Sequence, residues 1–405
     1  MSGGVARASL NRPAAAAAMA SPSSRAKKAC GKIAGVLQTF AGNLYVTLYS
    51  VSAPTFTSPP ASKDAVDLGA VRRDLTAWFE SFHDSRTGYG RYVPPADYGG
   101  GGGAGSRSGQ FYSSADIAIL RGIMGEDFSD LTAVQRSQWV DYLNSFQDRA
   151  DGSYQILTHH SKLHANGTAV GAIGLLGGRM AHPVRLYEPF DTPEKVVPWL
   201  ESAVDWSMQW TASHLFWGGI HCFSLSPGAS GGWIDTVFAW LDENVDKQTG
   251  WWRKGTPHGD RHHALGGSAH ILPMYQHHHR PFPCARQVID SVLALQTEAG
   301  NWHEGAHGLS YLDLDALYAY DFCKPLAGDY RAAEIRSSVA RFSGWLLGRF
   351  DEAWAHAVTS HPHIALCLVG TLGLLQRLEP DKYRDDRVWT DIFSDRRLYR
   401  VAENP

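Results

Sequence analysis

Ionisable side chains recur where helical patterns begin in this 405-residue sequence. Asp313 and Asp315 stand two residues apart at the start of one such pattern, and His363 stands at the start of another. The first turn of a helix carries a partial positive charge, which favours the ionised form of a carboxylate. Other helical patterns also begin with an Asp or a His: Asp116, His164, His214, His221, His262, His263 and His361.

These side chains fit a divalent metal site. Carboxylate and imidazole groups are common ligands of zinc, and a catalytic zinc site keeps one position open for water or substrate. The sequence therefore predicts a site for a divalent metal such as zinc, with a small-molecule substrate beside it. The candidate ligands are Asp313, Asp315, His363 and His262.

The same side chains also fit acid–base catalysis without a metal. When two carboxyl groups lie close together in an apolar cavity, one of them stays protonated and can act as a strong acid. We assign this role to Asp315, with Asp313 as its partner. Histidines serve as general bases near neutral pH. The candidate catalytic residues are Asp313, Asp315, His363, His164 and His263.

Residues this far apart in the sequence can act together only if the helices that carry them meet. A single histidine at a helix start is more often a cap or a solvated side chain. A repeated turn, however, predicts a regular arrangement of helices. In each copy, Gly supplies a positive φ, Asp, Asn or Thr closes the turn through its side chain, and an aromatic residue packs the turn against the helix ends. The copies are residues 84–89, 148–154, 246–252 and 296–302.

Six helical hairpins are predicted along the chain. In each pair the first helix is amphipathic and the second is richer in small and apolar residues, as expected of a helix buried on more than one side. Six outer helices around six inner helices make an all-α, (α/α)6 toroid, in which the starts of the inner helices gather at one mouth. The pairs are 70–83 with 112–124, 131–147 with 162–178, 194–212 with 214–225, 230–245 with 262–278, 284–297 with 311–323, and 329–350 with 360–378.

The repeats predict a single toroid domain over residues 64–396, because no linker divides them. Residues 397–405 are assigned to a C-terminal tail. Residues 1–63 contain Arg and Lys but no Asp or Glu, and they are rich in Ala and Ser. This composition is typical of a transit peptide. It predicts import into a plastid or mitochondrion, whereas a plain disordered tail would leave the protein cytoplasmic.

The turn from Gln147 to Tyr154 resembles the QW repeat of squalene–hopene-type cyclases and protein prenyltransferase β subunits, and the stretch from Gln296 to Trp302 is a shorter version. Both families have α/α-toroid folds, so the resemblance implies the same architecture over residues 70–378. It also implies acid- or metal-assisted chemistry on an isoprenoid-like substrate, as in a transferase or terpenoid cyclase.

Two site motifs of these families are matched in part. Asp313 and Asp315 fall where prenyltransferase β subunits carry a D-x-C zinc pair, and His363 opens a segment that resembles the one around their zinc-binding histidine. Asp315 replaces the Cys of that pair. The same residues resemble the D-x-D-D motif with which class II terpene cyclases protonate their substrate, but Ala316 stands in place of the last Asp.

Two further functions compete with this interpretation. Toroids of this kind also serve carbohydrate enzymes, namely polysaccharide lyases, glycan hydrolases and sugar epimerases, whose sites use His, Tyr and Trp in a cleft. Tyr311 and Trp217 are candidates for such a role. The third alternative is a non-catalytic toroidal binding subunit. A closed apolar pocket favours isoprenoid chemistry, and an open cleft with polar edges favours a sugar.

Composition excludes some partners. The net charge of −3 without a long basic run argues against nucleic acid. No apolar run reaches the roughly 18 residues that a membrane-spanning helix needs. The five Cys are scattered and form no CxxC, which predicts reduced, mostly buried thiols. A partner subunit or a homo-oligomer remains compatible with the sequence.

Overall fold

The computed structural model describes residues 65–93, 107–154, 161–206, 213–252, 261–303, 308–359 and 361–402. These residues all belong to one compact unit that spans residues 53–405. The predicted targeting segment, residues 1–63, lies outside the described residues, as does most of the glycine-rich insertion before the second helix.

The described part of the chain is predominantly helical, which confirms the predicted all-α class. Each of the predicted helix ranges contains a helix, and α15 is an addition. The longer elements are α2 (Leu68–Glu80), α3 (Arg107–Ile123), α4 (Ala133–Asn144), α5 (Lys162–Leu175), α6 (Pro193–Ser202), the π-helix η4 (Phe216–His221), α8 (Cys222–Ser224), α9 (Gly231–Asn244), α10 (Arg261–Ala269), α11 (Leu272–His277), α12 (Ala285–Leu295), α13 (Tyr311–Ala327), α14 (Ala332–Leu347), α15 (Phe350–Thr359) and α16 (Pro362–Leu378).

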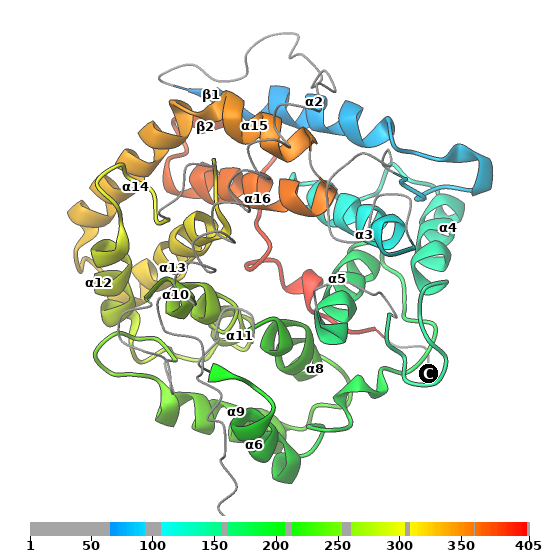
Figure 1. Ribbon diagram of the computed structural model, residues 1–405, viewed down its shortest axis with the longest axis horizontal. Helices are drawn as coiled ribbons and strands as arrows, with labels where there is room; N and C mark the ends of the chain where they lie inside the picture. The colour runs from blue at the N-terminus through cyan, green and yellow to red at the C-terminus, as the bar shows by residue number, and fades with distance from the viewer. Residues whose placement is uncertain are drawn as a thin grey trace, which may run out of the picture. The chain divides into compact units, whose positions relative to one another are not determined.

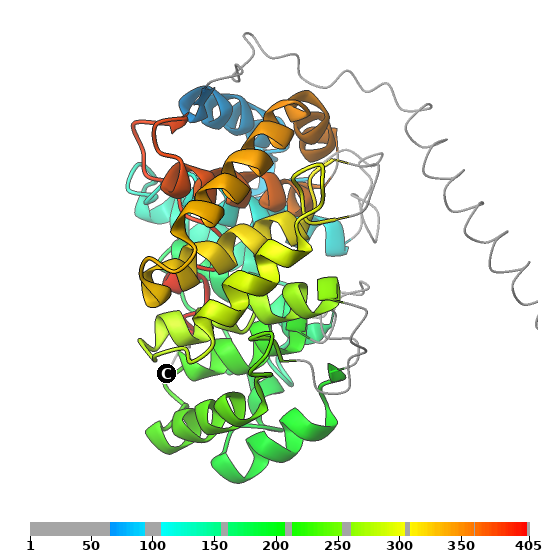
Figure 2. The same cartoon turned by 90° about the vertical axis from the view of Figure 1, so that its left-hand side faces the viewer.

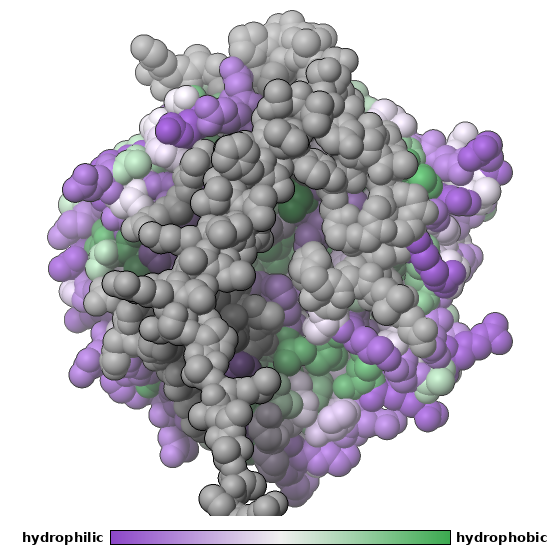
Figure 3. Space-filling model, in the orientation of Figure 1, coloured by the Kyte–Doolittle hydropathy of each residue, from purple (hydrophilic) through white to green (hydrophobic). Residues whose placement is uncertain are grey.

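The helices of this unit form an inner and an outer set. Figure 1 shows α3, α5, α8, α10, α13 and α16 nearer the middle, and α2, α4, α6, α9, α12 and α14 further out. Neighbouring inner elements are in contact: α3 with α5, α5 with η4, α10 with α13, and α13 with α16. On the face drawn in Figure 3, most hydrophilic residues lie along the perimeter and hydrophobic residues gather toward the middle.

The first and last elements of the unit are fastened together. Strand β1 (Val66–Asp67) pairs in parallel with β2 (Tyr383–Arg384), and α16 packs against α3. Arg72 of α2 reinforces this junction with an ion pair to Asp385, whose carboxylate oxygen lies 2.8 Å from Nε. Figure 1 and Figure 2 both show α2 beside α15. The last inner helix, α16, therefore lies against the first, α3.

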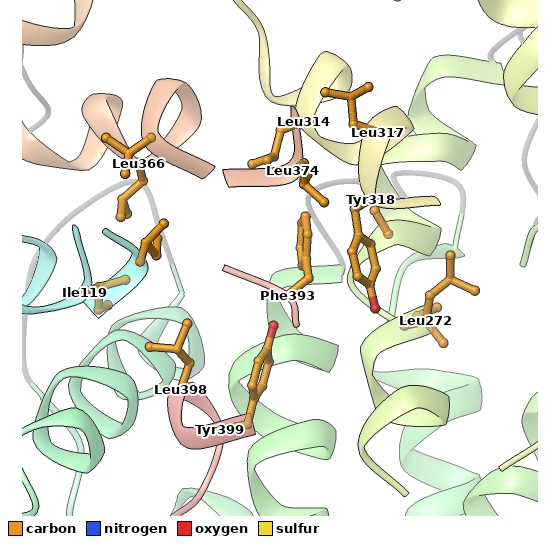
Figure 4. Packing of buried hydrophobic residues seen from close by; sticks show 14 of the residues in the cluster. Ile119, Leu272, Leu314, Leu317, Tyr318, Leu366, Leu374, Phe393, Leu398 and Tyr399 are labelled. Carbon is orange, nitrogen blue, oxygen red and sulfur yellow. The ribbon is translucent and has the colours of Figure 1, made fainter. Parts of the chain in front are cut away.

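The segment that follows β2 passes between the inner helices instead of leaving the unit. An added Cβ at Gly373 of α16 would lie 1.8 Å from the Thr390 carbonyl oxygen, and one at Gly174 of α5 would lie 2.7 Å from that of Arg397. Tyr399, which belongs to the predicted tail, is fully buried. Figure 4 shows it with Phe393 among side chains of the inner helices. Glycines on the inner helices thus allow the backbone of the C-terminal segment to pack closely against these helices.

The repeated turn has the predicted construction. A glutamine precedes the copy at 148–154 and begins the copy at 296–302, and its side-chain nitrogen donates to the carbonyl oxygen of the turn glycine, at 2.9 Å from Gln147 to Gly152 and 2.7 Å from Gln296 to Gly300. The glycines adopt a positive φ of 69° and 106°. The aromatic residue also packs as predicted, because Trp302 donates from its indole nitrogen to the Val292 carbonyl oxygen at 2.9 Å.

Candidate functional site

The middle of α3 and the start of α16 bring a carboxylate and a histidine together. His363 Nδ1 lies 3.1 Å from Asp116 Oδ2 and 3.2 Å from Oδ1. Asp116 is completely buried, whereas 22% of the His363 side chain is exposed. Because a carboxylate is an acceptor, Nδ1 carries the proton in this pair, and the lone pair of neutral His363 is on Nε2. Asp116 therefore fixes the orientation of the His363 ring and leaves Nε2 as the nitrogen that can exchange a proton.

A second pair lies directly beside the first. The Tyr112 hydroxyl of α3 is 3.2 Å from His164 Nδ1 of α5. The ring centroids of His164 and His363 are 5.5 Å apart, and those of Tyr112 and His363 are 5.4 Å apart. Tyr112, Asp116, His164 and His363 are called the mouth cluster below. Three inner helices, α3, α5 and α16, contribute to it.

Aromatic side chains from η4 extend the mouth cluster. The Trp217 ring is 5.1 Å from that of His164, centroid to centroid, and the ring of the predicted residue His214 is 4.7 Å from it. The cluster therefore combines polar groups with a flat apolar surface, the mixture that small-molecule sites use to orient a ligand.

Helix caps place the two histidines of the cluster. The Ser161 hydroxyl accepts a hydrogen bond from the His164 backbone nitrogen at 3.1 Å, which fixes the start of α5. His361 does the same for α16, because its Nδ1 accepts from the His363 backbone nitrogen at 3.2 Å. The other nitrogen of His361 lies 3.0 Å from the Ser113 hydroxyl. His361 is thus occupied in capping and holding α16 to α3.

The charge of Asp116 controls the pKa of His363. Burial lowers the pKa of this imidazole, but the negative charge of Asp116 and its hydrogen bond outweigh burial, so the pKa is raised. In His361 burial dominates, and its pKa is lowered. The protonated form is therefore favoured in His363, and the neutral form is favoured in His361, although only one residue separates them.

Asp313 is occupied by the loop that precedes its own helix. Its carboxylate accepts hydrogen bonds from the backbone nitrogens of Trp302 at 2.7 Å and Ser310 at 2.9 Å. His303 Nδ1 lies 3.0 Å from the same group. This carboxylate closes the turn at 296–302 onto the start of α13, a structural task that its place in the sequence did not reveal.

Asp315 is buried and unpaired. Within the described part of the chain, neither of its carboxylate oxygens has a hydrogen-bond partner. Burial, followed by the charge of Asp313, raises its pKa well above the ordinary value. This is the direction expected for the protonated member of a carboxylate pair. Burial raises the pKa of the nearby Tyr311 well above its ordinary value, and the charge of Asp315 adds to this rise. The Tyr311 hydroxyl donates a hydrogen bond to the His363 carbonyl oxygen at 2.7 Å.

The histidines of α10 contribute less. The side chain of His263 lies outside the described residues. His262 is half-buried, and its Nε2 makes no hydrogen bond to a described residue. Across the described ranges no group of three or more His, Cys, Asp or Glu side chains is arranged to hold a metal ion. The predicted ligand set Asp313, Asp315, His363 and His262 stays a prediction.

A different pair of histidines is buried among the inner helices. His221 Nε2 lies 3.0 Å from His277 Nδ1, and the His221 ring stacks on that of Tyr399 with centroids 4.0 Å apart. His277 is the last residue of α11 and begins a run of three histidines, in which exposure increases along the chain: His277 is buried, His278 is half-buried and His279 is exposed.

Sequence reasoning missed the partners in the mouth cluster. The sequence predicts Asp116 at the start of a helix over residues 112–124, but α3 begins at Arg107 and Asp116 lies in its middle, and no role is predicted for Tyr112. One signal was available, since Tyr112 and Asp116 are four residues apart and so share a helix face.

Comparison with known protein families, with curated proteins and with solved structures finds no match to this chain. In the described part of the chain no helix is long and apolar enough to cross a membrane.

Proposed function

We propose that this protein is an enzyme that performs acid–base chemistry at the mouth cluster of an (α/α)6 toroid. The toroid is supported by the contacts of α3 with α5, α5 with η4, α10 with α13, α13 with α16 and α16 with α3, by the hydrogen bond between His221 of η4 and His277 of α11, and by the outer helices around them. A closed series of inner helices accounts for side chains from distant parts of the sequence meeting at one place.

The observation that carries the proposal is the hydrogen-bonded pair of Asp116 and His363. His363 Nε2 accepts a proton from the substrate, and the buried carboxylate of Asp116 stabilises the imidazolium that forms. The Tyr112 hydroxyl is held by His164, and its ring centroid lies 5.4 Å from that of His363, so it can serve as a proton donor or acceptor for the opposite transfer. The four residues thus supply a base, its orienting acid and a second proton-transfer pair.

A polar, sugar-like substrate suits this cluster best. Its members offer hydrogen bonds from several directions, and Trp217 supplies a flat surface against which a sugar ring can pack. The corresponding reactions are those of lyases, epimerases and glycan hydrolases, in which a proton is removed or delivered at a ring carbon or a glycosidic oxygen.

Asp315 favours a second candidate function. A carboxylic acid that is buried without a partner beside a second carboxylate is suited to protonate an olefin. In that case the substrate is isoprenoid-like and the reaction resembles that of a terpenoid cyclase. The catalytic residues would then be Asp315 and Asp313, with the mouth cluster as the base that ends the reaction.

Substrate panels with matched variants distinguish the two candidates. The wild-type protein is incubated with polyuronates and neutral glycans, and separately with polyprenyl alcohols, diphosphates and squalene, and products are identified by mass spectrometry. Turnover of a glycan that His363→Gln abolishes and Asp315→Asn preserves supports the first candidate. Cyclised isoprenoid that Asp315→Asn abolishes supports the second. Turnover unaffected by either substitution refutes both site assignments.

The predicted zinc site has its own test. Metal analysis of the purified protein is compared with that of Asp315→Ala and His363→Ala. Zinc that is bound by the wild type and lost in both variants supports the ligand set. Zinc that is retained in both variants would rule out the predicted ligand set.

A further inference from the structure

A separate apolar pocket lies between α15, α16 and the start of α13. Its volume is about 330 Å³, at the lower end of the range for small-molecule sites. One wall is formed by Ala353 and Ala357, which stand four residues apart on the same face of α15. The facing wall is formed by Ile364 and Leu368 of α16, again four residues apart, and Leu309 closes one end.

The two alanines explain why the space exists. A larger side chain at either position would project toward α16 and fill the gap, as core positions normally do at native packing density. Both alanines are buried, and α15 and α16 are in contact. The described residues that line the pocket include no Asp, Glu, Lys or Arg, and its polar lining comes from His303, His356, Ser310 and Tyr311 at the side of the apolar walls. The pocket therefore suits an uncharged, apolar occupant.

The pocket adjoins the mouth cluster through Tyr311 and Ile364, although no member of the cluster lines it. Tyr311 lines it and donates from its hydroxyl to the His363 carbonyl oxygen at 2.7 Å. Ile364, the residue after His363, lines it as well. The thiol of Cys367 lines the same space and gives a chemical reporter there. An occupant would thus contact the residues that hold the His363 backbone without touching the imidazole.

We propose that this pocket is a binding site for a short hydrocarbon chain. The chain packs between the two alanines of α15 and the branched side chains of α16, with Tyr311 and Cys367 along its edge. The chain is supplied either by the apolar part of the substrate or by a separate lipid-like ligand. The site does not depend on the acid–base assignment of the mouth cluster.

The probe is 1-octanol, with glycerol as a polar counterpart. Binding is measured by calorimetric titration, and labelling of Cys367 by N-ethylmaleimide is followed by mass spectrometry with and without octanol. Ala357→Phe fills the pocket. Ala355→Phe places the same side chain on α15 at a position that does not line the pocket and serves as the matched control.

Octanol is expected to bind the wild type and Ala355→Phe, and to slow labelling of Cys367 several-fold in both. Ala357→Phe should lose binding by tenfold or more, and glycerol should not bind. His363→Gln should bind octanol as the wild type does, so failure of the proposed chemistry leaves this result unchanged. Octanol binding that Ala357→Phe leaves intact, or no calorimetric binding by the wild type, overturns the proposal. Competition between octanol and the identified substrate would assign the pocket to the substrate, and its absence to a separate ligand.

Discussion

The mouth cluster and the pair His221–His277 use the same residue type to opposite effect. Each brings a buried or largely buried histidine from one helix against a partner from another helix. The partner of His363 is a carboxylate, and the pKa of His363 is raised. The partner of His221 is a second imidazole, and burial, followed by the charge of His277, lowers the pKa of His221 well below its ordinary value. The partner, and not the histidine, therefore decides which site can exchange protons near neutral pH.

Hydrogen bonding at the His221–His277 pair has a defined direction. His277 Nε2 faces the Ser394 carbonyl oxygen at 3.3 Å, so this nitrogen carries the proton. His277 Nδ1 then accepts from His221 Nε2, which leaves the lone pair of His221 on Nδ1. That atom is buried and has no hydrogen-bond partner among the described residues. The pair is thus organised for two neutral rings and serves the packing of the C-terminal segment.

The largest expected contrast is in activity. His363→Gln should lower kcat by about 10²–10⁴-fold, the range that one general acid or base contributes. His277→Gln, the matched change at the buried pair, should leave kcat within a few-fold of the wild type. Steady-state kinetics on the substrate identified by the panels measures both. Equal losses in the two variants would mean that the mouth cluster has no special role.

The second contrast concerns stability. Tyr399→Ala removes a fully buried ring that stacks on His221, and it should cost about 3–5 kcal/mol in the free energy of unfolding. Tyr399→Phe keeps the ring and loses one hydrogen bond from the hydroxyl to the Ile392 carbonyl oxygen, so it should cost about 1 kcal/mol. Urea unfolding measures both. A cost for Tyr399→Ala no larger than that of Tyr399→Phe would show that the C-terminal segment is dispensable for the core.

The third contrast is in pH dependence. Burial lowers the pKa of His277 to about 4. Because the folded pKa lies below the unfolded value of about 6.5, the folded state binds fewer protons, and the stability from neutral His277 is fully present above pH 6.5 and lost as the pH falls toward 4. Over this pH range the wild type should lose roughly 1–3 kcal/mol more of its free energy of unfolding than His277→Gln, which has no imidazole at this position to protonate. Parallel stability curves for the two proteins between pH 4 and 7 would rule out this account.

The stability contribution of Asp315 should depend on pH in the opposite direction to that of His277. Its folded pKa is raised, so its stability contribution is present below about pH 3.8 and is lost as the pH rises toward neutrality. Asp315→Asn, which cannot ionise, should therefore raise the stability at pH 7 by about 1 kcal/mol. Thermal unfolding at pH 4 and pH 7 tests this, because the gain should be present at pH 7 and small at pH 4. A loss at pH 7 would show that the ionised carboxylate is compensated in the fold.

The sequence by itself determined the helices and turns. Helical periodicity, the capping residues Ser161 and Ser310, and the glycines of the repeated turn act over a few residues, so their structural consequences can be read locally. The helix ranges and the buried, free state of Cys222, Cys284, Cys323 and Cys367 can be predicted in the same way. Cys30 lies outside the described residues.

Only the tertiary structure decided which polar groups meet. Asp116 and His363 are 247 residues apart, and their contact depends on how α3 and α16 are rotated and offset against each other. Asp313 was predicted to act with Asp315, yet its oxygens bind the loop before α13, because a carboxylate in the first turn also finds unpaired backbone nitrogens nearby. The course of the C-terminal segment between the inner helices was likewise not predictable, since it depends on space left by glycines on helices far away in the sequence.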